Sequence, residues 1–462
     1  MTEVVLMVPP GGVVYYPSLG LGYLAAVLEQ RCIPVSIIDC PALGWDLRAC
    51  IRHLVVMKPK IIGISVFSSA TPVVYKLINA IKETLPKSLV VLGGPHFEIW
   101  PESAKDYNAD YAFHGDCELV FADLCERELG GRRKRRNEEL QGLIYRDGDQ
   151  LKINEKQRVA LDAIPFPARH LFPLTKYYSP HDYGSRGFTA SIISSRGCLG
   201  HCVFCCNLSQ EVRYRSPSNV IAELVELKRL GAGYVEFVDE MFVQDHARTY
   251  DICRILREQD FGLKWGMQTP IRTLTEELIR TLAISGCVKI SVGVESGVER
   301  IRRRIGKPIT DEKLFTVVAL CRKYGISVLA HYIFGHPTET LLEMHETIRF
   351  ALRLNTNYAN FNRCVILPGT RLWQLAVQEG RQKADFWKRY MLGGAALPLY
   401  IPEGVTGPQF NWVFRKALIR YYLRPAFFWE KVRSLRNISQ LRHLIHLGTV
   451  FFRILFRKRG TW

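Results

Sequence analysis

The sequence predicts two consecutive α/β units, a doubly wound parallel sheet followed by a partial barrel, and a helical region at the C-terminal end. Short apolar runs alternate with amphipathic helical stretches over residues 1–128 and again over 188–400, as in parallel sheets covered by helices. A length of 462 residues exceeds one ordinary domain, and a hydrophobic fraction of 48% excludes a largely disordered chain. The strand patterns stop after about residue 410, and residues 401–462 are basic, aromatic-rich and helical in pattern.

The first unit, residues 1–128, has the alternation of a flavodoxin-like sheet. Strands are expected at 3–8, 34–38, 61–66, 89–92 and 110–113, and helices at 20–30, 46–57, 72–84 and 118–128. Ligands of such sheets bind beyond the carboxyl ends of the strands. Those ends carry glycines and small hydroxyl residues, which let a large ligand approach the backbone, although ordinary turns use the same residues. The segments concerned are 9–12, 65–69, 93–96 and 114–116.

Residues 129–187 are predicted to be a hairpin and a linker. Gly130 and Gly131 lead into the basic run 132–136, and Asp147-Gly148 is a typical hairpin turn. The proline-rich stretch 165–173 indicates a linker on the surface.

The second unit, residues 188–400, is predicted to be a partial (β/α)6 TIM-type barrel. The expected strands are 191–195, 234–238, 264–267, 288–293, 327–334 and 358–365, each followed by a helical pattern. Barrel enzymes place their chemistry at the carboxyl ends of the strands.

Three cysteines follow the first barrel strand. Cys198, Cys202 and Cys205 have the spacing C-x3-C-x2-C on a loop where a barrel enzyme places its chemistry. Three thiolates so close together can hold three irons of a [4Fe–4S] cluster. The alternative is a zinc site, for which His201 or Cys206 would have to supply a fourth ligand.

The N-terminus has no basic segment before an apolar run, and the chain has no apolar run near 18 residues. These features indicate a cytoplasmic protein, whose 13 cysteines do not form a disulfide framework and whose close-set thiols are metal ligands or nucleophiles. The net charge of +18 is concentrated in residues 410–459, which hold twelve Lys and Arg and one acid, Glu430. Interleaved basic and aromatic residues suit peripheral contact with an anionic membrane. A helical cap on the barrel is the alternative, and nucleic acid is not expected as a partner because nothing else in the chain supports it.

The cysteine loop resembles that of the radical-SAM superfamily, whose three cysteines bind a [4Fe–4S] cluster with S-adenosylmethionine (SAM) on the fourth iron. Further segments resemble the strand-end motifs of one branch of that superfamily: 212–217, 237–242, 293–297, 334–340 and 367–370. Residues 17–24, 64–65 and 93–96 resemble cobalamin-binding domains. Together they resemble the cobalamin-dependent radical-SAM class, which implies an N-terminal cobalamin-binding sheet before the barrel.

The resemblance also implies site residues. SAM is expected at Asp239, Glu240, Glu295, Gly335 and Pro337, with a structural ion pair to an arginine as the alternative for Glu295. The motif D-x-H-x-x-G, whose histidine ligates cobalt, is missing, since His53, His96 and His114 lack its spacing. Cobalamin is therefore expected to bind without a protein histidine on cobalt. Its expected contacts are Pro17, Ser18, Leu19, Gly20, Ser65, Phe67, Ser68, Gly93, Gly94, Pro95, His96 and Gly115.

The implied activity is reductive cleavage of SAM to a 5′-deoxyadenosyl radical and methylation of an unactivated carbon. We expect a small, hydrophobic substrate, lipid-like or tetrapyrrole-like, and a low-potential electron donor such as flavodoxin or ferredoxin. Two alternatives are an oxidative cyclase or ring-rearranging enzyme that transfers no methyl group, and a non-catalytic cobalamin carrier or sensor. Elsewhere in the barrel, Arg302, Arg303, Arg304 and Lys307 are expected to form a solvated helix end.

Overall fold

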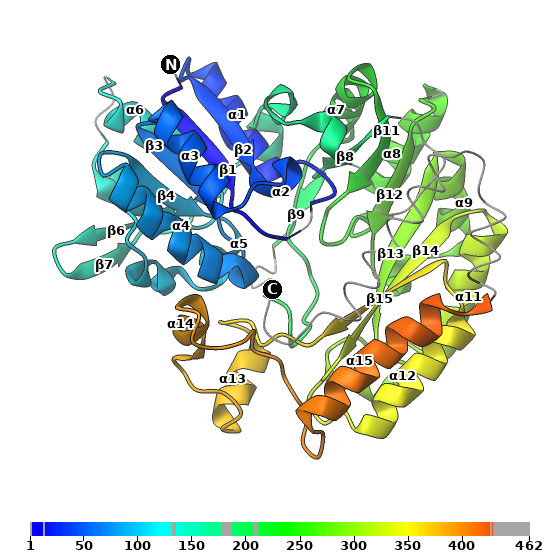
Figure 1. The fold of residues 1–462 in the computed structure, drawn as a ribbon. Coiled ribbons are helices and arrows are strands. Elements are labelled where there is room, and N and C mark those ends of the chain that lie inside the picture. The colour runs from blue at the N-terminus through cyan, green and yellow to red at the C-terminus, as the bar shows by residue number, and fades with distance from the viewer. Residues whose placement is uncertain are drawn as a thin grey trace.

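The computed structural model describes residues 2–12, 14–131, 135–177, 187–206, 211–259, 261–425 and 427. Two α/β units lie side by side, and the chain passes from the first to the second through a connecting segment (Figure 1). The predicted fold class is confirmed, because a doubly wound sheet precedes a curled parallel sheet and helices follow.

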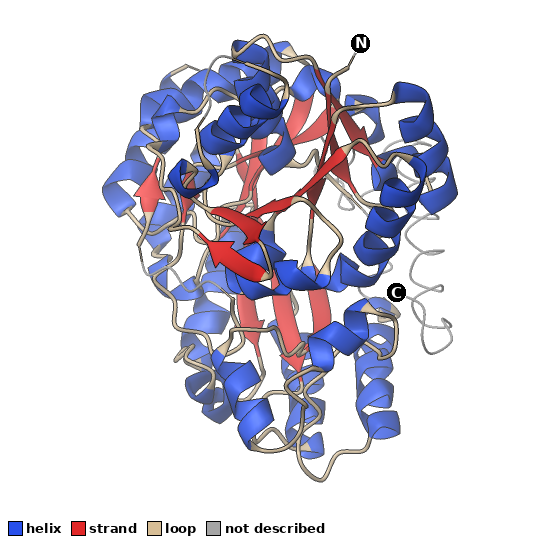
Figure 2. Cartoon of the chain, turned by 90° about the vertical axis from the view of Figure 1, so that its left-hand side faces the viewer, coloured by secondary structure: helices blue, strands red, loops and turns tan. Residues whose placement is uncertain are grey.

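The first unit is built on a seven-stranded sheet with the order β2-β1-β3-β4-β5-β6-β7. Helices cover both of its faces (Figure 2), so the parallel strands are apolar on both sides. In β1, for example, Val4 and Leu6 join one core while Val5 and Met7 join the other. The parallel strands are β1 (Val4–Val8), β2 (Val35–Asp39), β3 (Ile61–Ser65), β4 (Leu89–Gly93) and β5 (Tyr111–Phe113). The helices are α1 (Leu19–Gln30), α2 (Cys40–Leu43), α3 (Leu47–Met57), α4 (Thr71–Thr84), α5 (Pro95–Ile99) and α6 (Glu118–Glu128).

The predicted hairpin forms and extends this sheet. Its strands are β6 (Leu143–Asp147) and β7 (Gln150–Ile153), and Gly148 in the turn has a φ of +58°. β6 pairs antiparallel with β5, with Phe113 opposite Leu143. The hairpin thus belongs to the first sheet rather than standing apart with the linker, because strand pairing is a tertiary contact that local pattern does not report.

The second unit is a six-stranded parallel sheet with the order β15-β14-β13-β12-β11-β8, curled into an open half-barrel (Figure 1). Only the first strand differs clearly from expectation, because the chain leaves the sheet after Ile192 and forms a two-stranded pair around the cysteine loop. The strands are β8 (Phe188–Ile192), β11 (Ala232–Phe237), β12 (Lys264–Gln268), β13 (Cys287–Glu295), β14 (Ser327–Phe334) and β15 (Tyr358–Arg363), and the extra pair is β9 (Ser195–Arg196) and β10 (Arg213–Tyr214). The helices of this unit are α7 (Pro217–Arg229), α8 (His246–Glu258), α9 (Glu276–Ile284), α10 (Glu299–Arg304), α11 (Asp311–Lys323) and α12 (Leu341–Leu354).

Alternate residues of the barrel strands point to opposite faces of the curled sheet. On β13, Ile290, Val292 and Val294 join the large apolar core beneath the outer helices. Lys289 and Ser291 on the same strand take the other face, which we call the inner face.

The segment after β15 returns to the first unit. It carries α13 (Arg371–Gln378) and α14 (Phe386–Met391). The Tyr390 hydroxyl donates to the Ser69 carbonyl at 2.8 Å, Lys388 pairs with Asp106 at 2.8 Å, and Met391 lies in a core of the first unit. The post-barrel segment therefore ties the two units together.

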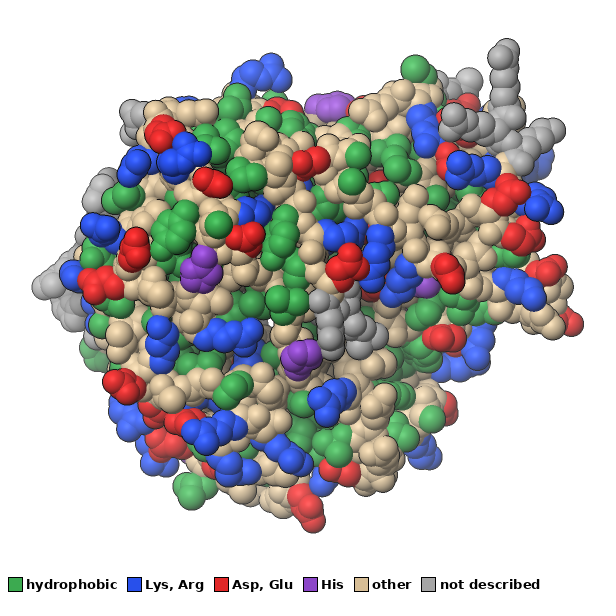
Figure 3. Space-filling view, turned by 180° about the vertical axis from the view of Figure 1, so that it is seen from behind, with side chains coloured by type: hydrophobic (Ala, Val, Ile, Leu, Met, Phe, Trp, Pro, Cys, Tyr) green, Lys and Arg blue, Asp and Glu red, His purple; other side chains and the backbone are tan. Residues whose placement is uncertain are grey.

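The last described helix, α15 (Gly407–Tyr422), packs on the outer face of the barrel through Phe410, Val413 and Tyr421. Most of the basic stretch 410–459 lies outside the described residues. Within the part of the chain that the structure describes, every helix is too short or too polar to span a bilayer. The face opposite to that of Figure 1 mixes cationic and anionic side chains (Figure 3).

Candidate active site

The three predicted ligand cysteines lie on one loop after β9. Cys198 and Cys202 approach each other across Gly200, where an added Cβ would lie 3.2 Å from the Cys198 sulfur and 4.0 Å from the Cys202 sulfur. The Gly200 amide donates to the Cys198 sulfur at 3.2 Å, and the Met241 sulfur is 3.0 Å from it. A side chain at position 200 would thus fill the space between two thiols.

Burial raises the pKa values of Cys198 and Cys202, and the ammonium group of Lys307 opposes this increase at both. The charge of Cys205 acts on both thiols, so the three sulfurs are near neighbours. Among the described residues, no three His, Cys, Asp or Glu side chains converge on one point as a single metal ion requires. A [4Fe–4S] cluster takes each thiolate on a different iron, so three spaced thiols beside a cation fit it.

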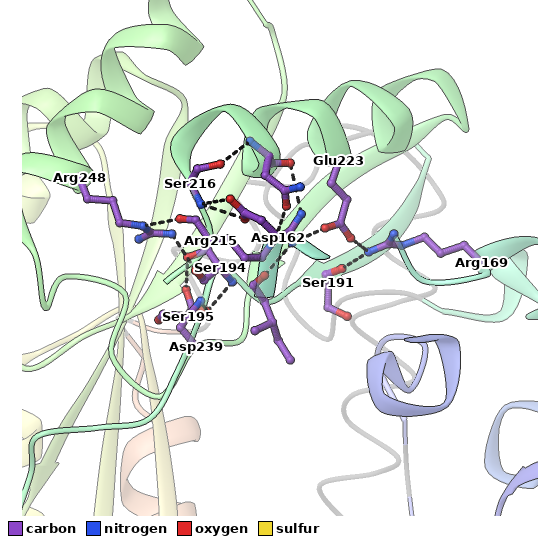
Figure 4. Close-up of polar contacts among 12 residues, drawn as sticks. Asp162, Arg169, Ser191, Ser194, Ser195, Arg215, Ser216, Glu223, Asp239 and Arg248 are labelled. Carbon is purple, nitrogen blue, oxygen red and sulfur yellow. Dashed lines mark hydrogen bonds and ion pairs between the residues drawn. The ribbon is translucent and has the colours of Figure 1, made fainter. Parts of the chain in front are cut away.

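The root of the cysteine loop is fixed by a buried polar network (Figure 4). Glu223 of α7 is fully buried and accepts hydrogen bonds from both Arg169 and Arg215. Arg169 also donates to the Ser191 carbonyl at 2.8 Å, and Arg248 donates to the Ser194 carbonyl at 2.8 Å. A carboxylate shared by two arginines forms charge-assisted hydrogen bonds with both, and these bonds fix the strand end before the cysteines.

Asp239, expected at SAM, belongs to this root network. Its carboxylate accepts from the Ser194 amide and hydroxyl at 2.6 Å and from the Ser195 amide at 2.8 Å. Burial raises its pKa to about 6 against the effect of these donors. With both oxygens engaged, Asp239 holds the loop. Glu240 is exposed, and its carboxylate accepts from the Gly197 amide at 3.3 Å, so it lies beside the cysteine loop.

Glu295 ends β13 next to the cysteines and forms an ion pair with Lys307. The partner is a lysine rather than the arginine considered from sequence. Glu295 has a φ of +64°, a left-handed conformation that is costly outside glycine and concentrated at functional sites. A Cβ at Gly293 would overlap both the Glu295 carboxylate and the Lys307 ammonium. Glycine at 293 therefore makes room for this pair.

Lys307 and Arg302 correct the expectation of a solvated helix end. Arg302 is fully buried and donates to the carbonyls of Ser296 and Ile309 at 3.0 and 2.8 Å. Lys307 is turned toward the cysteine loop, where the Glu295 carboxylate and the negative charge of the Cys202 thiolate raise its pKa against the effect of burial. Charge density alone does not show which cations of a run are turned inward.

Gly335 and Pro337 lie in a buried turn after β14. Glu339 is buried and accepts from the Gly335 amide at 2.7 Å and the His336 amide at 3.1 Å. Burial raises the pKa of Glu339 to about 8 and lowers that of His336 to about 3. The His336 ring packs 5.7 Å from Phe204 of the cysteine loop, so this turn lies against the cysteines.

The predicted cobalamin contacts cluster at the carboxyl edge of the first sheet. Gly94, with a φ of +96°, packs so closely that an added Cβ would lie 2.9 Å from the Val66 nitrogen. At Gly93 and Gly20 an added Cβ would meet nothing within 4 Å. Phe67 is 54% exposed beside them. An open edge of glycines with an exposed aromatic ring fits a large, flat cofactor such as cobalamin.

His96 is buried below this edge. Its ring nitrogens lie 3.0 Å from the Ser68 hydroxyl and 3.1 Å from the Ser103 hydroxyl, and burial lowers its pKa to about 4. Both ring nitrogens are engaged by these hydroxyls, so His96 holds the loop. Pro95 begins α5, and the Gly115 amide donates to Glu98 at 2.8 Å.

The carboxyl ends of the two sheets meet. Leu19 and Tyr23 of α1, just after Pro17 and Ser18, pack with Ile193 and Val238 at the ends of two barrel strands. Arg196, two residues before the first cysteine, pairs with Asp116 at 2.7 Å and Glu118 at 2.6 Å. The two carboxylates raise the pKa of Arg196. The cysteine loop is thus attached directly to the edge that carries the predicted cobalamin contacts.

Comparison with known proteins agrees with this two-site architecture. Residues 192–351 match the radical SAM superfamily, and residues 13–125 match the B12 binding domain. An uncharacterized methyltransferase of Pyrococcus horikoshii is 30% identical over 419 residues, which cover 88% of this chain and 88% of that protein. The chain belongs to the cobalamin-dependent radical-SAM enzymes.

Two further relatives of this cobalamin-dependent radical-SAM enzyme are informative. The cytidylyl-2-hydroxyethylphosphonate methyltransferase of Streptomyces wedmorensis is 28% identical over 79% of this chain and 78% of its own. The radical S-adenosylmethionine methyltransferase TsrM from Kitasatospora setae, solved with cobalamin and a [4Fe-4S] cluster bound, has a TM-score of 0.72 at 18% identity, covering 92% of each chain. The latter supports the fold.

Proposed function

We propose that this enzyme methylates an unactivated carbon of a small molecule with SAM as the methyl and radical source. One observation carries the proposal: the Arg196 ion pairs join the cysteine loop to the edge of the B12 binding domain. A methyl group carried by the B12 binding domain can then reach a substrate that is activated beside the cysteine loop of the barrel. The relatives include both methyltransferases, at 30% and 28% identity, and cyclases, at 24% and 23%, and the higher identity of the former favours methyl transfer.

When bound, the [4Fe–4S] cluster supplies electron transfer and cobalamin supplies a methyl carrier. Cys198, Cys202 and Cys205 would hold the cluster, and Lys307 balances thiolate charge beside them. Glu295 is the carboxylate best placed to accept hydrogen bonds from SAM, because its backbone is held in a strained conformation next to the cysteines. The electron must come from a low-potential partner of the flavodoxin or ferredoxin kind.

The expectations of a hydrophobic substrate and of membrane contact both rest on residues 410–459. The described part of that stretch ends at Phe427, so neither expectation is carried into the proposal.

The proposal is tested with Cys198→Ala after anaerobic reconstitution with iron, sulfide and cobalamin. We expect the cluster absorbance and 5′-deoxyadenosine formation to be lost, because one of three ligands is gone. Cys206→Ala, on the same loop, serves as the control and should retain both. With methyl-labelled SAM the parent enzyme should yield labelled product. Deoxyadenosine without labelled product would contradict methyl transfer, and an intact cluster in Cys198→Ala would contradict the ligand assignment.

A further inference from the structure

The inner face of the half-barrel is polar where barrel interiors are usually filled by Val, Ile and Leu. Glu236 of β11 and Lys289 of β13 form an ion pair whose side chains are 7% and 8% exposed. The Tyr234 hydroxyl also donates to Glu236. Between the two strands stands Gly266, where an added Cβ would lie 3.0 Å from Glu236 and from Lys289 and would overlap the Tyr234 hydroxyl. At this position, between the two charges, β12 therefore has no side chain.

This polar surface continues toward the cysteine loop. His331 of β14 lies opposite Gly293 on the neighbouring strand, and the charges of Lys289 and Lys307 both act on its ring. Lys307 pairs with Glu295, so the lysines of both ion pairs lie near this one histidine. The two pairs together carry no net charge.

The open edge of the sheet adds amide groups. Asn360 and Asn362 of β15 alternate with Ala359 and Phe361, which are buried against the outer helices. Asn360 lies opposite His331 in register, and both asparagines are exposed. Amides present both donors and acceptors, and the exposed side chains of Asn360 and Asn362 are open to a ligand.

The first domain reaches the same surface. Tyr16, in the loop between β1 and α1, is close enough to Glu236 that this carboxylate raises its pKa further after burial. The inner face therefore lies between the two domains, where the proposed reaction takes place.

Buried ion pairs cost desolvation and contribute little stability over apolar packing, so a polar interior points to a ligand. We propose that the inner face binds a water-soluble substrate rich in hydroxyl, amide or other uncharged hydrogen-bonding groups, with Asn360 and Asn362 among its contacts. This rests on the proposed function for the reaction itself. It replaces the expected lipid-like substrate, since a hydrocarbon would cover the exposed amides of Asn360 and Asn362 and offer them no hydrogen-bond partners.

The test compares two substrate sources on the fully reconstituted enzyme. An aqueous metabolite fraction and a chloroform–methanol lipid fraction of the cells that produce the protein are each added with methyl-labelled SAM. We expect only the aqueous fraction to stimulate 5′-deoxyadenosine formation. In the double variant Asn360→Leu/Asn362→Leu, that stimulation should fall by about tenfold or more, because the substrate groups that the amides bind would be buried without a hydrogen-bond partner. The affinity of this variant for SAM should be unchanged. Gln259→Leu, an exposed amide on the outer surface, is the matched control and should behave as the parent.

Three results would overturn the inference: stimulation by the lipid fraction or by neither fraction, equal stimulation of the double variant, or loss of SAM affinity in that variant. A separate readout addresses the reaction. If the aqueous fraction stimulates deoxyadenosine formation but no product carries label, methyl transfer fails while the polar substrate class stands.

Discussion

Single residues decide how much room this active site has. Gly293 and Gly266 lie on the inner face of adjacent strands, and each leaves space for an ion pair that a methyl group would displace. Both positions are therefore constrained by the charged side chains beside them rather than by backbone conformation.

The substitution Gly293→Ala tests whether the space beside the Glu295–Lys307 ion pair is needed. The added Cβ would displace Glu295 and Lys307, so we expect SAM affinity to fall by at least about tenfold with an intact cluster, since a lost charged hydrogen bond is worth about 1.5–3 kcal/mol. Equilibrium filtration with labelled SAM measures the change. Gly407→Ala, where an added Cβ meets nothing within 4 Å, is the control. Unchanged SAM affinity in Gly293→Ala would separate the Glu295–Lys307 pair from SAM binding.

His96 makes the first domain sensitive to acid. Its folded pKa is about 4, against 6.5 for a free histidine, so the ring is neutral in the folded protein. Its contribution to stability is complete above pH 6.5 and is lost as the pH falls toward 4, because only the unfolded ring takes up a proton. Between pH 7 and 5 the loss is about 2 kcal/mol. His96→Gln should show a smaller decrease in the urea midpoint over this range, whereas exposed His53→Gln should match the parent. Equal slopes in all three proteins would refute this role of His96.

At the scale of elements, the ends of β3 and β4 form one surface through two glycines with different roles. Gly94→Ala forces Cβ against the Val66 backbone at a φ of +96°, so we expect a lower melting temperature and weaker cobalamin binding. Gly93→Ala faces open space and should keep the melting temperature, yet it should weaken cobalamin binding if the corrin lies over it. Bound cobalamin is measured by its absorbance after gel filtration. Full cobalamin binding by Gly93→Ala would indicate that the corrin does not lie over this edge of the sheet.

The elements themselves were largely predictable, since apolar alternation and helical periodicity depend on local sequence. The spacing predicts the three cysteines as cluster ligands, and the structure places them on one loop with their sulfurs close together. Contacts across the chain were not, because a pattern does not show which partner a charge will find. The sequence thus indicates Glu295 but not Lys307, and Arg302 looks solvated although it is buried. The Glu236–Lys289 pair lies on two strands that are not adjacent, and nothing local joins them.

At the scale of the whole molecule, the two domains are joined next to the chemistry. Asp116 and Glu118 lie at the rim of the first sheet, and Arg196 and Arg213 lie at the root of the cysteine loop. Asp116 accepts from both arginines, and Glu118 accepts from Arg196. These side chains are at most 22% exposed, so the ion pairs are less screened than surface pairs.

Arg196→Met should leave cluster assembly and cobalamin binding intact but uncouple the two sites. We expect deoxyadenosine formation to continue while methylated product falls by about tenfold or more, because a small misplacement of reacting groups is costly. The ratio of the two products, measured in one reaction, reports the coupling. Arg303→Met removes an exposed pair with Glu299 and is the control. A parallel loss of both products in Arg196→Met would indicate simple destabilisation instead.

The return of α14 to the first domain has a consequence for how the protein is made. Met391 completes a core whose strands β1 to β5 are synthesised before residue 114, so that core stays unfinished while the barrel is being translated. At about 5–20 residues per second, this interval is tens of seconds. The first domain therefore leaves the ribosome without one apolar side chain of this core, which arrives only after the barrel has been synthesised.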